Sequence, residues 1–212
     1  MRVERLGDAA VILYELPMPS HLVAKALESL SDCREAAAGY DAVGLYFDPG
    51  RLEVQDIESF VLGLGQDGEA EPVREVRVPV CYELGDDIAE CAGLLGISSE
   101  DLAAEHCSGP YDCFALGFTP GFPYLGYLSD RIAGLPRRAA PRVRVAKGSI
   151  GITGRQTGIY PAEGPGGWNL IGRTPLEIVN LKDRYFPLNA GDRVAFYMID
   201  FDEYRRLEGE RL

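Results

Sequence analysis

The sequence predicts an α+β protein in which a small N-terminal α/β domain is followed by a β-rich domain. Over roughly the first 70 residues, amphipathic helical patterns alternate with short apolar strands. A polar, glycine-containing stretch, 65–72, then interrupts the pattern. Beyond it, Gly109 to Gly191 holds 14 of the 25 glycines and 9 of the 14 prolines, which is typical of short strands joined by tight turns in a barrel or sandwich. We therefore expect domains at 1–72 and 73–212.

The N-terminal domain is expected to contain two strands and two helices. The strands cover 11–14 and 42–48, and the turn Asp48-Pro49-Gly50 follows the second strand. The first helix is predicted to start from Ser20 as N-cap and to be closed by Gly39. The apolar faces of the two helices consist of residues at helical spacing: Val23, Ala26, Leu27 and Leu30, then Ile57, Phe60, Val61 and Leu64.

The second domain is expected to open with a half-buried strand at 75–82, where valines alternate with other residues. Two short helices follow. The first is capped by Asp86 or Asp87 and stopped by Gly96, and Ser98 caps the second. The remaining strands are predicted at 111–116, 149–153, 170–171, 176–180 and 193–199.

The composition excludes several classes of protein. A net charge of −12 argues against general nucleic-acid binding, which needs Lys and Arg to neutralise phosphates. No apolar run approaches the ~18 residues of a membrane span, and the charged N-terminus does not resemble a signal peptide. Five cysteines without CxxC pairing favour reduced thiols in a cytoplasm. With two histidines in addition, no metal site is expected.

The charges of the second domain are unevenly placed. From Val78 to Asp130 there is no Lys or Arg, while nine residues are acidic. From Arg131 to Ala162 seven residues are basic and none is acidic. Either the two segments face each other and neutralise, or the basic one forms an anion site or a docking face for an acidic partner.

Two dense segments are candidates for a binding site. The loop Gly117–Gly126 has three glycines, two prolines and three aromatic residues, so it forms either a ligand wall or a rigid plug of the barrel end. The stretch Lys147–Asn169 places polar donors among glycines and the only Trp. These residues either bind a carboxylate or amide ligand or form hydrogen bonds to the backbone of their own loops. No catalytic motif and no phosphate loop is present. His106, the only histidine of this domain, is more typical of a structural hydrogen-bonding group than of a base.

Four longer motifs together resemble the family of 5-oxoprolinase B subunits, also called KipI-like or allophanate-hydrolase-subunit-1-like. They are GFTPGFPYLGYL, the Pro141-Arg142 pair, KGSIGITGRQTGIYP and GPGGWNLIGRTPLEI. The chain is similar as well to the first half of the carboxyltransferase domain of urea carboxylase. The resemblance covers essentially the whole chain. One departure is Lys147, which stands where the family usually has a small apolar residue.

The resemblance implies that the second domain is a cyclophilin-like β-barrel. It also implies a cytoplasmic protein that is inactive alone and acts with a homologous C subunit (KipA-like) and an A subunit of the LamB/YcsF type. The complex would hydrolyse 5-oxo-L-proline to L-glutamate with ATP, because a lactam is a poor electrophile and phosphorylation of its oxygen creates a leaving group. The resemblance does not locate the ATP site in this chain. An apolar barrel face left open without partners would favour homo-oligomers of the isolated chain.

The resemblance also implies site residues. A substrate-binding wall and loop would consist of Phe118, Pro120, Gly121, Phe122, Pro123 and Tyr124. Ligand-facing polar and aromatic groups would be Gln156, Thr157, Tyr160, Trp168 and Asn169. Arg155 would contact an anion and Lys147 would be a variant contact. The catalytic residue stays open, with His106, Arg155 and Gln156 as candidates.

Two other functions compete with this interpretation. A KipI-type inhibitor would bind a sensor histidine kinase through its surface and would need no pocket. Neighbouring genes for the A and C subunits would favour the enzyme, and a neighbouring kinase gene would favour the inhibitor. A biotin-dependent carboxyltransferase fragment would need a biotin carboxylase and a carrier, neither of which this chain contains.

Overall fold

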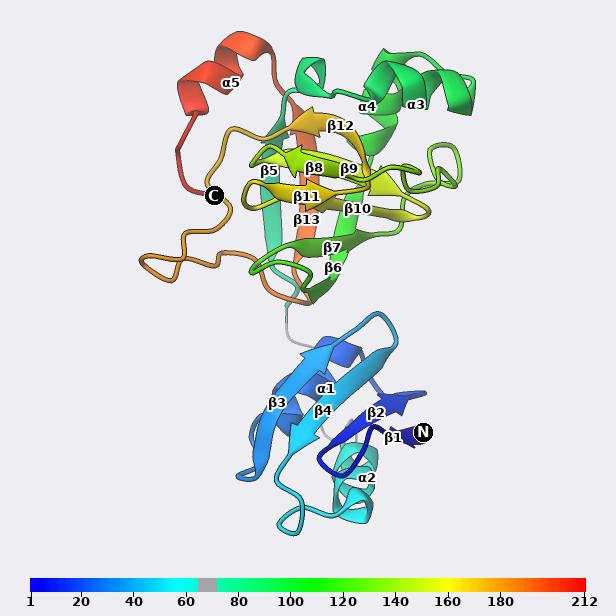
Figure 1. The fold of residues 1–212 in the computed structure, drawn as a ribbon, viewed down its shortest axis with the longest axis vertical. Helices are drawn as coiled ribbons and strands as arrows, with labels where there is room; N and C mark the ends of the chain where they lie inside the picture. Colours follow the sequence, from blue (N-terminus) through cyan, green and yellow to red (C-terminus); the bar gives the residue numbers. More distant parts are fainter. Residues whose placement is uncertain (65–71) are drawn as a thin grey trace. The chain divides into compact units, whose positions relative to one another are not determined.

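The computed structural model describes residues 1–64 and 72–212, which fall into two compact units, Met1–Val73 and Arg74–Leu212 (Figure 1). Of the stretch in which the sequence predicts the domain boundary, residues 65–71 lie outside the described residues. The elements are mixed helices and strands, which confirms the predicted α+β class.

The first unit is an antiparallel sheet of order β1-β2-β4-β3 with two helices. Its strands are β1 (Arg2–Arg5), β2 (Ala10–Tyr14), β3 (Cys33–Ala38) and β4 (Ala42–Phe47), and its helices are α1 (Ser20–Leu27) and α2 (Val54–Gly63). The apolar faces of both helices and the alternate residues of the central strands form one core, in which Leu13, Leu27, Leu45 and Ile57 are fully buried. The first unit therefore has its own hydrophobic core.

The first helix is shorter than the sequence predicts. α1 ends at Leu27, its N-cap is Pro19, and Ser20 is its first helical residue. The segment 33–38, expected inside the helix, is the edge strand β3, which pairs with β4. Its alanines favour a helix, but β4 offers a row of unpaired backbone groups and Ala36 reaches the core, so tertiary pairing overrides propensity.

The second unit is built on a seven-stranded sheet of order β12-β9-β10-β7-β6-β13-β5, in which only β13 and β5 run parallel (Figure 1). Its strands are β5 (Glu75–Val80), β6 (Pro110–Leu116), β7 (Pro123–Gly126), β9 (Ser149–Thr153), β10 (Gln156–Ile159), β12 (Asn169–Arg173) and β13 (Arg193–Met198). A separate ribbon pairs β8 (Arg142–Val145) with β11 (Gly164–Gly166). The helices are η1 (Tyr82–Leu84), α3 (Ile88–Leu95), α4 (Ser99–His106) and α5 (Phe201–Leu207).

The seven-stranded sheet curls until its two edges meet. Cys81, which follows β5, and Arg173, at the end of β12, exchange two backbone hydrogen bonds of 2.9 and 3.0 Å. Val78, Ile150, Ile152 and other fully buried residues fill the space inside this curled sheet. The predicted strand at 176–180 is wrong, since this segment makes only isolated bridges. It follows β12, the edge strand whose end already pairs with Cys81.

Two of the predicted helix signals of this unit, at Ser98 and Gly96, are confirmed. The Ser98 hydroxyl accepts a hydrogen bond from the backbone N–H of Asp101, and Gly96 ends α3 in the left-handed conformation. Asp87 is the N-cap residue of α3, but its side chain makes no capping bond. That carboxylate is used instead to join α3 to the strands beside it.

Candidate functional site

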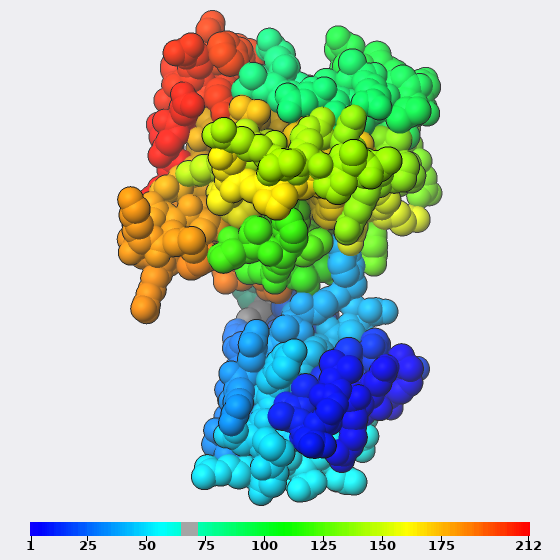
Figure 2. Space-filling model, in the orientation of Figure 1, coloured from blue at the N-terminus to red at the C-terminus, as the bar shows by residue number. Residues whose placement is uncertain are grey.

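A cavity of about 270 Å³ lies in the second unit and is walled mainly by aromatic rings. We call it the aromatic pocket. Its lining residues come from β7 and the loop before it, from the segment before β8, and from β11 and the segments on both sides of it. They are Phe118, Phe122, Tyr124, Arg137, Arg138, Pro141, Tyr160, Pro165, Gly166, Gly167 and Trp168. These segments, coloured green, yellow-green and yellow, lie next to one another on the face shown in Figure 2.

Phe122 is the centre of the aromatic wall. Its ring is fully buried and makes edge-to-face contacts with Phe118, Tyr124, Tyr160 and Trp168, at centroid distances of 5.7, 5.0, 5.2 and 5.4 Å. Such pairs add to the stabilisation from burial and fix the ring orientations. All of these rings except that of the exposed Phe118 belong to a small core cluster distinct from the core inside the sheet. The pocket is therefore a rigid surface that is formed before a ligand binds.

Glycines allow the backbone to approach these rings. A Cβ at Gly166 would lie 2.5 Å from the Tyr160 hydroxyl oxygen, and one at Gly158 would lie 2.9 Å from Cζ of Phe122 and 2.8 Å from the carbonyl oxygen of Pro123. Phe118 adopts a positive φ of 65°, which is rare for a bulky residue and places it at the pocket with its ring 60% exposed. The shape of the wall thus depends on backbone positions that tolerate little change.

We expect Gly158→Ala to destabilise the second unit by about 1–3 kcal/mol, because the new methyl group overlaps a backbone oxygen that cannot move alone. Urea unfolding measures this loss. Gly164→Ala is the matched control, since a Cβ there meets no atom within 4 Å. Equal stability of the two variants would show that the wall adapts freely.

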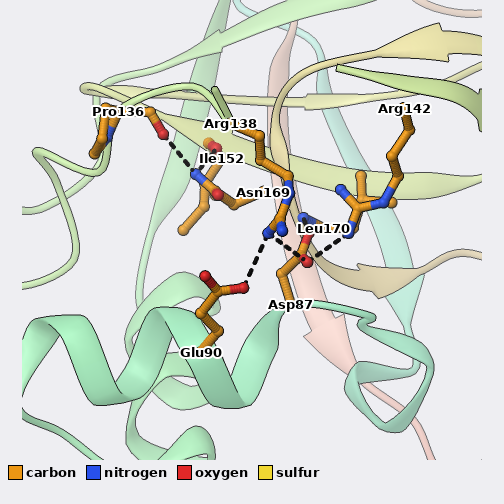
Figure 3. A network of polar contacts seen from close by, with 8 residues as sticks. All are labelled: Asp87, Glu90, Pro136, Arg138, Arg142, Ile152, Asn169 and Leu170. Carbon is orange, nitrogen blue, oxygen red and sulfur yellow. Dashed lines mark hydrogen bonds and ion pairs between the residues drawn. The ribbon is translucent and has the colours of Figure 1, made fainter. Parts of the chain in front are cut away.

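A buried carboxylate organises the arginines beside the pocket (Figure 3). Oδ1 of Asp87 accepts hydrogen bonds from Nη1 of Arg138, at 2.9 Å, and from Nη2 of Arg142, at 2.5 Å. Oδ2 of Asp87 accepts the backbone N–H of Leu170 at 2.7 Å. Arg138 also donates to Glu90 at 2.9 Å. The Asp87 side chain is only 4% exposed, so this network fixes α3, β12 and the segment before β8 to one another.

The acidic and basic segments of the second domain do face each other. Besides the Asp87 network, Arg131 pairs with Asp101 and Glu105, and Arg155 pairs with Asp130 at 3.3 Å. The neutralisation that the sequence left as one of two alternatives therefore accounts for most of these charges. Arg137 differs, because it is exposed, lines the aromatic pocket and forms no ion pair within the described residues.

The structure brings five of the predicted site residues together at the aromatic pocket: Phe118, Phe122, Tyr124, Tyr160 and Trp168. Pro120, Gly121 and Pro123 shape the loop without lining the pocket. Gly121 has a positive φ of 74°, and a Cβ there would overlap a methyl group of Val179. The loop thus forms part of the cavity wall and is also a rigid turn.

The other predicted residues lie elsewhere. Arg155 is exposed, and its guanidinium lies over the Tyr127 ring. Nζ of Lys147 lies 3.6 Å from Glu177, and Gln156 is half-buried on β10. None of these three lines the aromatic pocket. Asn169 donates to the carbonyl oxygens of Pro136 and Ile152 and lines a second cavity of about 400 Å³, which Arg137, Arg138 and Glu90 also line (Figure 3).

His106 and Thr157 lie inside the core, and both ring nitrogens of His106 have a partner. The Thr157 hydroxyl donates to the carbonyl oxygen of Gly151, so it accepts from Nε2–H of His106 at 2.9 Å. Nδ1 then accepts from the hydroxyl of Tyr82 at 2.6 Å. Burial lowers the pKa of His106 to about 3, and Phe196 stacks on its ring. This geometry is that of a structural histidine, and His106 lines neither of the two cavities named above.

The buried histidine makes stability depend on pH. Since its pKa is about 3 in the folded protein and about 6.5 when unfolded, stability is complete above pH 6.5 and is lost as the pH falls toward 3. Between pH 7.5 and pH 5 we expect a loss of about 2 kcal/mol from this group. The His106→Gln variant has no group that titrates at this position. The difference between its free energy of unfolding and that of wild type should therefore be about 2 kcal/mol smaller at pH 5 than at pH 7.5, as measured by urea unfolding. A constant difference would contradict the buried neutral ring.

No His, Cys, Ser, Asp, Glu or Lys side chain among the described residues lines the aromatic pocket. Its polar side chains are two tyrosines and two arginines. Burial raises the pKa of Tyr160, although the Trp168 backbone N–H and the charges of Arg137 and Arg142 partly oppose this. In the described part of the chain, no group of three or more His, Cys, Asp or Glu residues could hold a metal ion. The lining residues therefore form a wall that can bind and orient a small molecule.

Sequence reasoning missed Arg137, Arg138 and Pro141 as pocket residues. The signal that could have identified them was the adjacent pair of arginines close before the Pro141-Arg142 motif, in a segment without acids.

No helix in the described ranges, 1–64 and 72–212, is long and apolar enough to cross a membrane.

Comparisons with known proteins agree on one family. The family model for the carboxyltransferase domain, subdomain C and D, matches residues 1–187. The B subunit of 5-oxoprolinase from Escherichia coli O157:H7 is 37% identical over 204 residues, which are 90% of this chain and 93% of that protein. The B subunit of 5-oxoprolinase from Bacillus subtilis (strain 168) is 42% identical over 159 residues, which are 74% of this chain and 65% of that protein.

A solved structure shares the fold. The crystal structure of TTHA0988 superposes with a TM-score of 0.80 at 35% identity and covers 90% of this chain. The chain spans only 40% of the length of TTHA0988 and 65% of the Bacillus relative. Because the family model matches most of its residues, the chain belongs to the family of carboxyltransferase domains, subdomain C and D.

Proposed function

We propose that this chain is the B subunit of an ATP-dependent 5-oxoprolinase, which hydrolyses 5-oxo-L-proline to L-glutamate, and that it is inactive alone. The observation that carries the proposal is the aromatic pocket. Its rigid wall of rings suits a small flat ring, and Arg137, which has no ion-pair partner among the residues that the structure describes, suits a carboxylate. The names of the two relatives support the same reaction.

The pocket is one wall of a composite site in this proposal. It lacks a general base and a nucleophile, so partner subunits have to provide them. We propose that these partners are a homologous C subunit (KipA-like) and an A subunit of the LamB/YcsF type, in the cytoplasm. The designation of the relatives as B subunits supports an assembly of several chains.

In this proposal ATP binds on one of the partner chains. The absence of a glycine-rich phosphate loop with its lysine from the lining of the aromatic pocket supports this assignment. On that chain ATP would phosphorylate the lactam oxygen and release ADP. Water would then add to the activated carbon and the ring C–N bond would break, with the amine as leaving group, to give an acyl phosphate of glutamate. A second water would release phosphate and leave glutamate.

The two units of this chain have different roles in the proposal. We propose that residues 73–212 form the cyclophilin-like barrel that carries the pocket and that residues 1–72 form a separate N-terminal domain. The curled sheet with meeting edges supports a barrel, and the pocket residues all belong to the second unit. A kinase-inhibitor function is not favoured, since it would leave the pocket without a purpose.

Reconstitution tests the proposed function. The chain is co-expressed with the C and A subunits of the same genome, and glutamate formed from 5-oxo-L-proline is measured with and without ATP. We expect ATP-dependent glutamate that is lost when this chain is left out. Equal turnover without this chain would contradict the proposal.

A further inference from the structure

We propose that Arg137 is the residue that selects the carboxylate of the substrate in the aromatic pocket; this inference rests on the proposed function and adds its specificity determinant. The sequence pointed instead to Arg155 as the anion contact. Arg155 does not line the pocket and is paired with Asp130.

The charges at the pocket leave one positive group for a ligand. Arg137 and Arg138 are the charged residues that line it. Arg138 donates to both Asp87 and Glu90, and Arg142 donates to Asp87 (Figure 3). Two guanidiniums therefore face two carboxylates, and their charges cancel. Arg137 adds a positive charge that this network does not balance.

Arg137 is also placed to act inside the pocket. It lies in the exposed segment between the two cavities and lines both of them. Its charge reaches the Tyr160 phenol in the pocket wall, where it opposes the effect of burial on the pKa of that group. An anion held by Arg137 would thus lie against the rings of Tyr160 and Trp168, which line the same cavity.

This arrangement defines the chemical class of the ligand. The edges and faces of the rings suit a small flat ring such as a cyclic amide. A planar guanidinium without a competing carboxylate can bind a ligand carboxylate with two parallel hydrogen bonds. The pocket therefore favours a cyclic amide that bears a carboxylate over the same ring with a neutral substituent.

The test compares an acid with its amide in the reconstituted complex. The kcat/KM values for 5-oxo-L-proline and for its carboxamide, 5-oxo-L-prolinamide, are measured for wild type, Arg137→Gln and Arg155→Gln. Arg144→Gln is the matched control, since Arg144 lies outside the pocket and pairs with Glu163. For Arg137→Gln we expect kcat/KM to fall by about 30-fold for the acid, because a charge-assisted hydrogen bond is lost. For the amide we expect kcat/KM to fall by less than about threefold.

Three results would overturn the inference: no change in Arg137→Gln, an equal loss for both substrates, or a selective loss in Arg155→Gln instead.

If wild type forms no glutamate, the proposed function fails separately, and ligand binding to the full chain then tests the role of Arg137. The only Trp lies in the pocket, so Trp168 fluorescence reports on it. 5-Oxo-L-proline should then shift the emission at lower concentrations than the carboxamide, and Arg137→Gln should remove the difference. Equal concentrations in wild type would contradict the inference.

Discussion

Replacement of Asp87 by Ala should lower the free energy of unfolding by about 3 kcal/mol, the lower end of what breaking a buried ion pair costs. The carboxylate is 4% exposed and accepts hydrogen bonds from two arginines and from the backbone N–H of Leu170. Without it, that N–H is left buried without an acceptor. Arg138 and Arg142 are 30% and 24% exposed and can turn partly toward water, which keeps the loss from being larger.

Urea unfolding measures this effect, with Asp86→Ala as the matched control. Asp86 is the preceding residue, carries the same group and is more exposed than Asp87. Asp87→Asn separates charge from hydrogen bonding, because an amide oxygen can still accept the Leu170 N–H. We expect its stability to fall between the two alanine variants. If Asp87→Ala is as stable as Asp86→Ala, the network does not anchor α3 to the strands.

Replacement of Phe122 by Ala should have the largest effect on the pocket and should cost about 3–5 kcal/mol of stability. The ring is fully buried and contacts four other aromatic rings, so its removal leaves a cavity and frees the orientation of Tyr160 and Trp168. The fluorescence of the only Trp should change in the folded variant for the same reason.

Phe118→Ala removes the same side chain from an exposed position of the same loop. Since Phe118 is 60% exposed, we expect it to cost less than about 1 kcal/mol. Thermal and urea unfolding of the two variants provide the comparison. Similar losses would mean that Phe122 is not the centre of the wall.

The sequence predicted much of the pocket because aromatic and glycine residues are informative together. The loop before β7 could be recognised from its composition, and its rings do line a cavity. Gly158 and Gly166 are glycines because rings lie against their backbone. This close contact explains why the two dense segments, far apart in the chain, form one wall.

Polar residues were harder to place from the sequence, because their roles depend on which face of a strand they occupy. Thr157 and Gln156 are neighbours on β10, so their side chains point to opposite faces, and Thr157 is the one that enters the core. The role of Arg137 depends on which other arginines the acids neutralise, and pattern alone does not show the pairing. β3 was missed because strand pairing overrides the helix propensity of its alanines.

The most direct test of this account is a crystal structure of the assembled complex with bound 5-oxo-L-proline. We expect the lactam ring in the aromatic pocket, against Tyr160 and Trp168, with its carboxylate within hydrogen-bonding distance of the Arg137 guanidinium. A ligand held wholly by another chain of the complex, or in the second cavity beside Asn169, would contradict it.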